Sequence, residues 1–358
     1  MYGLITYIRN VLFDKGILKT QHHNIPILSV GNLKAGGTGK TPFVEYLLRT
    51  FSSSFNIAVV SRGYGRKTKG FFVVNPEGSA ETFGDEPLQM ARKFPEVMFV
   101  VCEDRNFAIK EIEKRNQESI ERNQESVERN QDSAERNKEI NLILLDDAFQ
   151  HRYTARDIDI LLTEYNRPFF SDKVIPFGLL REYRRGFKRA DYIVVTKCPP
   201  LNFEDKKRFV EKLKPRFGQR IFFSNIVYKA PYRIGNKSET IELENRSVVL
   251  FTGISNNAHI RKYIEERSTL IQTLTFDDHH SFTSKDRERI LERYNRVRKA
   301  DSILLTTEKD ASKLDGFHPD LYVLPIEIEV SLFSQSNETI KTKIQEDLCT
   351  IKSTKQQN

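Results

Sequence analysis

A glycine-rich loop between an apolar run and a helix-like pattern is the feature that most constrains the fold of this chain. Residues 27–46 read ILSVGNLKAGGTGKTPFVEY, and the loop contains Gly36, Gly37, Thr38 and Gly39. Because glycine lacks the side chain that would keep a polyphosphate off the backbone, successive N–H groups and the following helix N-terminus can face its oxygens. The stretch therefore predicts a strand, a phosphate-binding loop and a helix in succession.

Two side chains at the end of this loop suit nucleotide chemistry. Lys40 can reach the β- and γ-phosphates of ATP, and the hydroxyl of Thr41 can ligate Mg²⁺. The strict spacing of the phosphate-loop motif would place a glycine where this chain has Lys34, and a glycine turn without a ligand is the alternative interpretation. The intact GGTGKT between a strand and a helix favours an ATP site formed by Gly36, Gly37, Thr38, Gly39, Lys40 and Thr41.

Two adjacent carboxylates end a second apolar run. Residues 141–151 read NLILLDDAFQH, so that Asp146 and Asp147 follow a buried strand. An aspartate at the carboxyl end of a strand beside the phosphate loop can hold Mg²⁺ directly or through water. The alternative is a pair of turn aspartates without a metal. Gln150 and His151 follow at once and can orient ligands.

The order of strands and helices predicts the architecture. Six apolar runs alternate with helical stretches, which is typical of a doubly wound, mostly parallel α/β sheet. The last third holds a new set of strands and predicts a smaller second α/β lobe. We expect a helix at 1–20, a nucleotide-binding core at 21–219, the lobe at 220–348 and a polar tail at 349–358.

The first 20 residues form a basic, amphipathic helical pattern flanked by aromatic residues. Such a helix can lie in a membrane interface, or it can pack on its own domain. No run approaches the 18 apolar residues of a spanning helix.

A tandem repeat interrupts the core at residues 115–139, which begin RNQESIE, RNQESVE, RNQDSAE. It carries one apolar residue in seven, whereas a coiled coil needs two. We expect a solvated, partly helical insertion without core or active-site residues.

Composition narrows the class of partner. The net charge of +8 favours polyanions, meaning nucleotide phosphates, acidic lipid headgroups or nucleic acid. A nucleic-acid binder would leave the phosphate loop and the acidic pair unexplained, so no nucleic-acid partner is expected. The three cysteines lie far apart, which indicates neither a disulfide framework nor a zinc site and fits a reducing cytosol.

Four further polar motifs carry two interpretations each. In GDEP, Asp85 can be the N-cap of a helix. The basic loop SRGYGRKTKG and the segment PFGLLREYRR can bind phosphates or can simply be solvated. In FDDHHSF, four adjacent residues cannot converge on one ion, so we expect a polar loop with one functional imidazole.

Taken in order, the motifs SVGNLKAGGTGKTP, SRGYG, GDEP, LDDAFQH, LLREYRRG, DDHHSF and TTEKDA resemble the tetraacyldisaccharide 4'-kinase family, the lipid A 4'-kinases of Gram-negative bacteria. The resemblance implies ATP-dependent phosphorylation of the 4'-hydroxyl of a tetraacyl glucosamine disaccharide 1-phosphate. It also implies a location at the cytoplasmic face of the bacterial inner membrane, with the N-terminal helix anchored in that anionic surface. It names no protein partner.

The resemblance also assigns roles to residues. Lys40 and Thr41 look like nucleotide and Mg²⁺ ligands, Asp146 and Asp147 like the acidic pair near the metal, and Asp85 like the catalytic carboxylate, supported by His279. The secondary active-site residues that it implies are Arg105, Gln150, His151, Arg181 and Glu182. Ala148 replaces the glycine usual after the two aspartates, and the repeat is foreign to the family pattern.

The strongest rival function is that of a membrane-associated ATPase or nucleotide switch without a lipid substrate. Partitioning-type ATPases also use a GGTGKT loop and an amphipathic helix, and Lys34 near the glycines favours this alternative. Such a protein would hydrolyse ATP slowly, and lipid acceptors would not change the rate.

Overall fold

The computed structural model describes residues 2–128, 139–254, 257–277, 280–314, 317–333 and 338–356. They divide into two compact units, a larger one of residues 1–226 with 328–358 and a smaller one of residues 227–327. Each unit has a sheet of its own.

A nine-stranded sheet forms the centre of the larger unit. Its strands are β1 (Ile27–Asn32), β2 (Ile57–Ser61), β3 (Phe72–Val73), β4 (Met98–Val101), β5 (Leu142–Asp146), β6 (Ile158–Glu164), β7 (Tyr192–Thr196), β8 (Arg220–Tyr228) and β15 (Ile326–Leu332). The order is β15-β8-β7-β6-β1-β5-β2-β4-β3, and the seven strands from β8 to β4 pair in parallel. Only short β3 is antiparallel to its neighbour β4 among the pairs whose register is defined.

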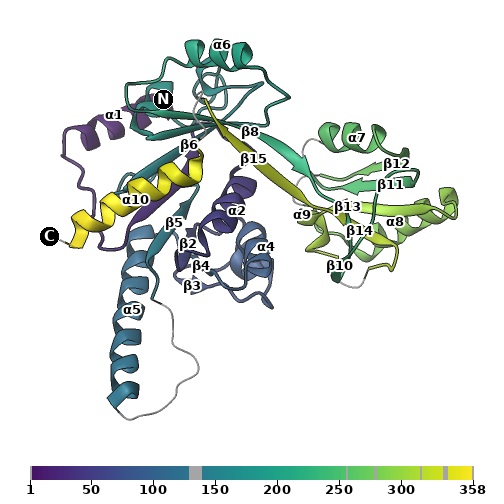
Figure 1. Ribbon diagram of the computed structural model, residues 1–358, viewed down its shortest axis with the longest axis horizontal. Helices are drawn as coiled ribbons and strands as arrows, with labels where there is room; N and C mark the ends of the chain where they lie inside the picture. The colour runs from purple at the N-terminus through teal and green to yellow at the C-terminus, as the bar shows by residue number, and fades with distance from the viewer. Residues whose placement is uncertain are drawn as a thin grey trace. The chain divides into compact units, whose positions relative to one another are not determined.

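Helices cover both faces of this sheet, because the strand residues alternate between two apolar faces. The helices of the larger unit are α1 (Tyr2–Asp14), α2 (Lys40–Phe51), α3 (Ala80–Phe83), α4 (Asp85–Lys93), α5 (Arg105–Glu128), α6 (Phe203–Leu213) and α10 (Ile340–Gln356), with 3-10 turns at Phe169–Ser171 and Arg184–Arg189. α2, α4 and α10 pack on one face, and α5 and α6 on the other. The predicted doubly wound, mostly parallel fold is confirmed (Figure 1).

The phosphate loop follows β1, the strand at which the order of successive strands in the sheet reverses. β1 pairs with β5 on one side and with β6 on the other, and the chain crosses from one half of the sheet to the other between these neighbours. Open parallel sheets bind ligands at such a point, outside the carboxyl ends of the strands. The topology therefore places Lys40 and the Asp146–Asp147 pair at one edge.

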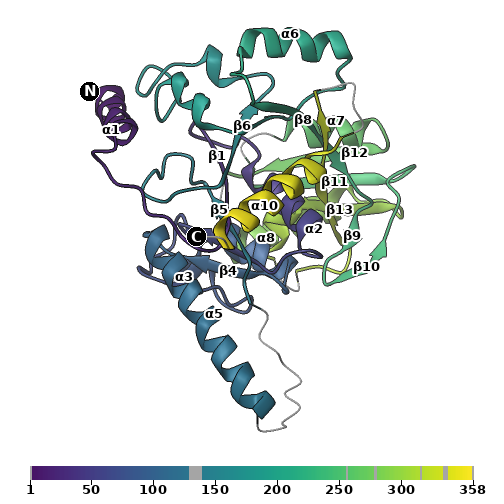
Figure 2. The ribbon, with the colours of Figure 1, turned by 60° about the vertical axis from the view of Figure 1, so that its left-hand side comes forward.

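The last helix corrects the expected domain boundaries. Residues 328–356 return to the larger unit, whereas we expected a C-terminal lobe at 220–348 and a free polar tail at 349–358. Ile340, Ile344 and Leu348 of α10 are buried in the sheet's core, and Figure 2 shows α10 running beside α2. Lys355, in the expected tail, pairs with Asp157 at 2.8 Å. The polar sequence of this segment concealed an apolar stripe at spacings of four.

The first repeat continues a helix of the core. α5 runs to Glu128, and both ribbon views show its far end extending away from the sheet. Asn116, in the first repeat, is buried and exchanges two hydrogen bonds with the backbone of Ile140, at 2.7 and 2.9 Å. The insertion is therefore attached at its base, and residues 129–138 lie outside the described part.

The smaller unit is an α/β lobe with a six-stranded sheet in the order β10-β9-β14-β13-β11-β12. Its remaining elements are β9 (Tyr232–Arg233), β10 (Asn236–Thr240), β11 (Ser247–Thr252), β12 (Thr269–Thr275), β13 (Ser302–Thr307), β14 (Leu321–Leu324), α7 (Ala258–Glu265), α8 (Ser284–Val297) and α9 (Glu308–Ala311). The expected second lobe exists, with β8 and β15 as its connections to the larger unit. In the described part of the chain, no helix is both long and apolar enough to span a membrane.

Candidate functional site

The phosphate loop is held in shape by its neighbours. Gly36 and Gly39 have φ of 107° and 83°, conformations that side-chain-bearing residues rarely adopt, and Gly39 leads directly into α2. The side-chain amide of Asn32 donates to the Thr38 hydroxyl at 2.6 Å, and the Thr196 hydroxyl donates to the Thr38 carbonyl at 2.8 Å. The loop is therefore preformed, with its open glycines facing outward.

A close backbone approach positions the acidic turn against this loop. A Cβ atom on Gly31 would lie 2.7 Å from Cβ and 2.8 Å from the amide nitrogen of Phe149. Only glycine permits β1 to pass so close to the turn that follows β5. This contact brings the acidic turn beside the start of α2.

Asp147 is held by two cations. Its two oxygens each accept a hydrogen bond of 2.9 Å from Arg181, and Lys40 Nζ lies 3.6 Å from Oδ1. Burial opposes its ionisation, but Lys40 and Arg181 outweigh burial and lower the pKa of this carboxyl. Asp147 is therefore an anion that orients Lys40 and Arg181.

Asp146 has the opposite environment. It is 5% exposed, and its Oδ1 has no hydrogen-bonding partner within the described residues. Burial, followed by the charges of Glu86 and Asp147, raises the pKa of Asp146 to about 7, against the lowering effect of Lys40 and Arg105. A buried, unpaired carboxylate oxygen beside the phosphate loop suits a hard divalent cation such as Mg²⁺.

The chain alone does not complete a metal cage at this place. No cluster of three or more His, Cys, Asp or Glu side chains in the described ranges could hold an ion. A cation at Asp146 would take its other ligands from the Thr41 hydroxyl, phosphate oxygens and water, which is the usual mode for Mg²⁺ at phosphates. The residues present fit Mg²⁺ in that form.

Arg105 adds a buried positive charge. It begins α5, is 5% exposed, and donates to the carbonyl of Glu103 at 3.2 Å. Burial lowers its pKa, while the charges of Asp146 and Asp147 partly restore it. The predicted residues Lys40, Arg105, Asp146, Asp147 and Arg181 therefore form one electrostatic cluster.

Gln150 and Glu182 form a hydrogen-bonded support behind the loop. Gln150 donates to the carbonyl of Asn32 at 2.8 Å and to Glu182 at 3.2 Å. Glu182 is 1% exposed and also accepts from Arg189 and from Asn10 of α1, at 2.7 and 2.6 Å. These two predicted residues position other groups, and their network joins α1 to the phosphate loop.

His151 lies close to the cluster as a neutral side chain. Burial, followed by the charges of Arg105 and Arg156, lowers its pKa to about 4. It therefore carries no charge near neutral pH.

Asp85 is the first residue of α4, and the N-cap is Gly84, with φ 90° and ψ 151°. The expectation that Asp85 caps the helix is wrong, because the non-helical residue that precedes the helix is Gly84 and Asp85 is already helical. The adjacent Glu86 acts on the pKa of Asp146, so the start of α4 lies at the acidic turn. Sequence reasoning missed Glu86, although it belongs to the same GDEP motif.

The predicted partner of Asp85, His279, lies outside the described residues. Its neighbour His280 is described, and its Nε2 lies 3.0 Å from Oδ2 of Asp286. Asp286 completes the capping box of α8 with Thr283. His280 therefore belongs to a helix cap in the smaller unit.

Two lysines beside the loop share one carboxylate. Lys34 is 6% exposed and lies 3.1 Å from Glu164, and Lys197 Nζ lies 2.6 Å from the other oxygen of Glu164. Lys197 also donates to the carbonyl of Gly37 in the loop. Lys34 is thus engaged within its own chain, which counts against the ATPase rival that this residue favoured.

Three comparisons with known proteins bear on this site. A sequence model of the family described as LpxK, tetraacyldisaccharide-1-P 4'-kinase, matches residues 1–346. A tetraacyldisaccharide 4'-kinase of Bacteroides fragilis is 36% identical, with 94% of this chain and 88% of the relative covered. One of Flavobacterium johnsoniae is 39% identical, with coverages of 91% and 89%.

A solved structure agrees with these relatives. LpxK of Aquifex aeolicus, crystallised in complex with ATP, superposes with a TM-score of 0.70 and 28% identity. The match covers 98% of this chain and 96% of that one.

Proposed function

The chain belongs to the tetraacyldisaccharide-1-P 4'-kinase family, and from that premise we propose which of its residues carry out the phosphoryl transfer. It is an ATP-dependent lipid kinase that phosphorylates the 4'-hydroxyl of a tetraacyl glucosamine disaccharide 1-phosphate in lipid A biosynthesis. The observation that carries the assignment of residues is the cluster of Lys40, Arg105, Asp146, Asp147 and Arg181 beside the preformed phosphate loop.

The chain's cations bind and orient the triphosphate. Phosphoryl transfer needs positioning and neutralisation of charge more than covalent chemistry. Open Gly36 and Gly37 let backbone N–H groups contact the phosphates, and Lys40 offsets the charge on the β- and γ-phosphates. Asp147 keeps Lys40 and Arg181 in place before the nucleotide arrives.

Asp146 and Thr41 would hold Mg²⁺. When bound, the ion offsets charge on the phosphate oxygens. Asp146 is favoured over Asp147 because its Oδ1 has no partner among the described residues, while both oxygens of Asp147 face Arg181. Glu86 adds a carboxylate beside Asp146 that can accept from metal-bound water.

Asp85 accepts the proton of the sugar hydroxyl as it attacks the γ-phosphate, and the family motif implies a supporting catalytic role for His279. Support for Asp85 comes from its place at the start of α4, next to Glu86 and the acidic turn. A general base of this kind typically contributes about 10²–10⁴-fold in rate. The role of His279 rests on the family motif.

α1 places the enzyme at the anionic cytoplasmic surface of the inner membrane. Its polar side is docked, because Arg9 donates to the carbonyl of Gln150 at 2.8 Å and Asn10 to Glu182 at 2.6 Å. Its other side shows Leu4, Ile5 and Ile8 to solvent, 58%, 59% and 49% exposed. A helix that is held to its own domain through polar side chains and exposes large apolar ones suits insertion among lipids.

The test is transfer of labelled phosphate from ATP to the tetraacyl disaccharide 1-phosphate, with and without Mg²⁺. We expect transfer that requires Mg²⁺ and is abolished by Lys40→Ala. Lys110→Ala, at an exposed position of α5 in the same unit, is the matched control and should keep activity. ATP hydrolysis that ignores the lipid acceptor would instead support the ATPase without a lipid substrate.

A further inference from the structure

Lys197, the residue after β7, adopts a backbone conformation that residues with a side chain rarely take. Its φ is 54°, in the left-handed region, where the Cβ atom makes the conformation unfavourable. Among the described residues other than glycine, Asp147, Lys214 and Asn245 share this feature. Lys214 ends α6 as its C-cap, an ordinary place for it, whereas Lys197 ends a strand beside the phosphate loop. The conformation of Lys197 therefore needs an explanation of its own.

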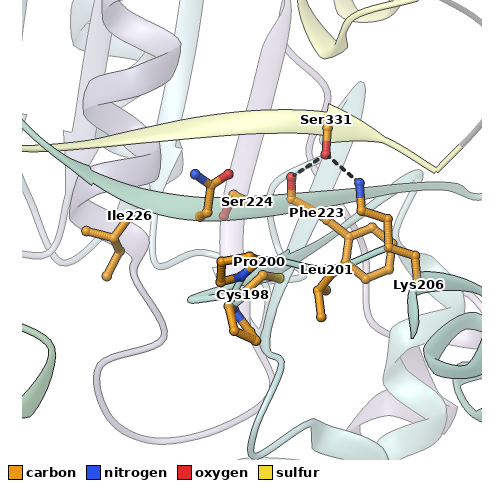
Figure 3. Close-up of a pocket in the computed structure, with 10 residues that line it drawn as sticks. Cys198, Pro200, Leu201, Lys206, Phe223, Ser224, Ile226 and Ser331 are labelled. Carbon is orange, nitrogen blue, oxygen red and sulfur yellow. Dashed lines mark hydrogen bonds between the residues drawn. The ribbon is translucent and has the colours of Figure 1, made fainter. Parts of the chain in front are cut away.

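Hydrogen bonds on both sides hold the chain at Lys197 in this conformation. The carbonyl of Thr196 accepts from the backbone N–H of Tyr165 at 3.0 Å, and the N–H of Cys198 donates to the carbonyl of Ser224 at 3.0 Å. Figure 3 shows Cys198 and Ser224 among the residues that line one pocket. The neighbours of β7 therefore fix the backbone at both ends of Lys197 and so direct its side chain.

The side chain of Lys197 joins the phosphate loop to the end of β6. Its ammonium donates to the carbonyl of Gly37 and lies 2.6 Å from Oε1 of Glu164, while Lys34 lies 3.1 Å from Oε2. Burial opposes the ionisation of Glu164, but the hydrogen bonds and charges of the two lysines outweigh burial and lower its pKa. Glu164 is therefore a fixed anion that keeps the ammonium of Lys197 at Gly37.

Two residues at the end of β7 turn two successive carbonyl groups of the loop towards this strand. Lys197 contacts the carbonyl of Gly37, and the Thr196 hydroxyl donates to the carbonyl of Thr38 at 2.8 Å. The N–H and C=O of a trans peptide point in opposite directions. The N–H groups of Thr38 and Gly39, which belong to the same two peptides, therefore point away from β7.

The glycine at position 37 makes the orientation of its peptide depend on the contact with Lys197. Glycine adopts both signs of φ at similar cost, and a Cβ atom at Gly37 would meet no atom of the described residues within 4 Å. If this peptide turned over, its carbonyl oxygen would face the anion that the N–H groups of the loop attract. The Thr38 N–H now contacts the Gly36 carbonyl at 3.0 Å, and a charged phosphate oxygen is the stronger acceptor. The contact with Lys197 therefore decides which side of the peptide the phosphates meet.

Lys197 is better suited to hold the loop than to bind phosphate itself. Two of the three donors of its ammonium are engaged, one with Gly37 and one with Glu164. To reach a phosphate it would have to leave a carboxylate at 2.6 Å. Lys40 lies 3.6 Å from Asp147 and is the more loosely held cation of the loop.

We propose that Lys197 is a positioning residue for ATP binding, which keeps the Gly37 carbonyl turned away from the phosphates and so presents the N–H groups of the loop to them. The left-handed backbone at Lys197 aims the ammonium at Gly37, at a cost in stability that a glycine would avoid. The inference rests on the proposed function only in that ATP binds at the phosphate loop. It assigns Lys197 no contact with the reacting atoms.

The experiment compares dissociation constants of ATP and inorganic tripolyphosphate, measured by calorimetry with Mg²⁺ present, with melting temperatures of variants of the full chain. Lys197→Ala and Lys197→Gly both remove the ammonium, but only glycine also relieves the backbone. Lys197→Arg keeps a cation at this position. The matched controls are Lys214→Ala and Lys214→Gly, because Lys214 is an exposed lysine with φ 51° at the end of α6.

We expect Lys197→Ala and Lys197→Gly to weaken the binding of both ligands equally, on the order of tenfold, the scale of one hydrogen bond from a charged group. Lys197→Gly should nevertheless melt on the order of a few degrees higher than Lys197→Ala, because glycine adopts positive φ without strain. Lys197→Arg should recover most of the lost affinity. Lys214→Gly should melt above Lys214→Ala by a similar amount, and neither control should change ATP binding.

Glu164→Gln separates positioning from direct attraction, because it removes the carboxylate that holds the ammonium at Gly37. Positioning predicts weaker ATP binding in this variant. Direct attraction of the phosphates by the released lysine predicts tighter binding, which would overturn the proposal. An ATP affinity of Lys197→Ala within about twofold of wild type, or an affinity that recovers with stability in Lys197→Gly, would also overturn it. If Lys197→Ala does not fold, Lys197→Gly provides the affinity measurement.

Failure of the proposed function would look different. These binding measurements contain no lipid acceptor. A chain whose ATP affinity depends on Lys197 but which transfers no phosphate to the disaccharide contradicts the kinase and leaves the role of Lys197 intact.

Discussion

Replacing Asp146 by Asn should stabilise the metal-free protein at pH 8, although it removes a residue of the candidate site. Asn has the same shape and cannot ionise. Asp146 is 5% exposed, and burial with the nearby charges of Glu86 and Asp147 raises its pKa to about 7 from 3.8. Ionisation of Asp146 therefore destabilises the folded state relative to the unfolded chain, in which water solvates the carboxylate.

The sign and size of this stability difference follow from the difference between the pKa values of Asp146 in the folded and unfolded states. Well below pH 3.8 the carboxyl is protonated in both the folded and the unfolded state, and the free energy of unfolding has its full value. As the pH rises towards about 7, the unfolded chain loses the proton first, so the free energy of unfolding falls. A pKa of about 7 instead of 3.8 corresponds to ~4 kcal/mol lost by pH 8, as an order of magnitude.

The assay is thermal unfolding of wild type and Asp146→Asn in chelator, from pH 5 to pH 8.5. The variant should melt higher at pH 8, by about 2–4 °C for each kcal/mol, and the difference should shrink towards pH 5. Asp147→Asn is the matched control of opposite sign, because Lys40 and Arg181 stabilise that anion and its loss should lower the melting temperature. Equal or lower stability of Asp146→Asn across this range would refute the reasoning.

Three further predictions concern catalysis, the membrane and the insertion. Asp85→Asn should lower turnover by about 10²–10⁴-fold, because it removes the proposed general base, and should leave ATP affinity unchanged. The melting temperature should also be unchanged, because the helix cap is Gly84 and not Asp85. A rate within a few-fold of wild type would contradict the role of Asp85 as general base. Replacing the exposed residues Leu4, Ile5 and Ile8 of α1 by serine should reduce co-sedimentation with anionic liposomes and leave folding unchanged. Unchanged liposome binding would exclude this face of α1 as the membrane anchor. A Gly/Ser linker in place of residues 121–136 should leave lipid-kinase activity and melting temperature nearly unchanged. Asn116→Ala, in contrast, should lower the free energy of unfolding by about 1–3 kcal/mol, because its two hydrogen bonds to the backbone of Ile140 are lost. A linker variant that melts well below wild type would show that the repeats pack on the core.

Local signals in the sequence determined the central unit of the fold. The glycines at 36 and 39 adopt φ of 107° and 83°, so the residue type alone required a loop of this shape between a strand and a helix. The alternation of apolar runs and helical stretches was sufficient for a doubly wound sheet, because each run had to be buried on both faces. The motifs around Asp85, Asp146 and Arg181 were sufficient for the family.

The sequence did not predict how the pieces beyond this unit are attached. α10 reads as a polar tail, yet it buries Ile340, Ile344 and Leu348 against strands that lie up to about 300 residues earlier in the chain. Its docking depends on a groove that exists only after the sheet has formed. The cap at Gly84 was missed for a related reason, since a backbone angle decides it and not the side chain of Asp85.

Tertiary structure alone decided what each charged residue does. Asp146 and Asp147 are the same residue type, one position apart, yet distant Arg181 and Lys40 contact one of them while the other keeps a buried oxygen without a partner in the described chain. In the sequence, Lys34 resembles a signature of the rival ATPases. In the structure, it pairs with Glu164, which lies 130 residues later in the chain. The sequence supplies the chemical groups, but burial and long-range neighbours set their charge and freedom, because electrostatic energies depend on distance and solvent exposure.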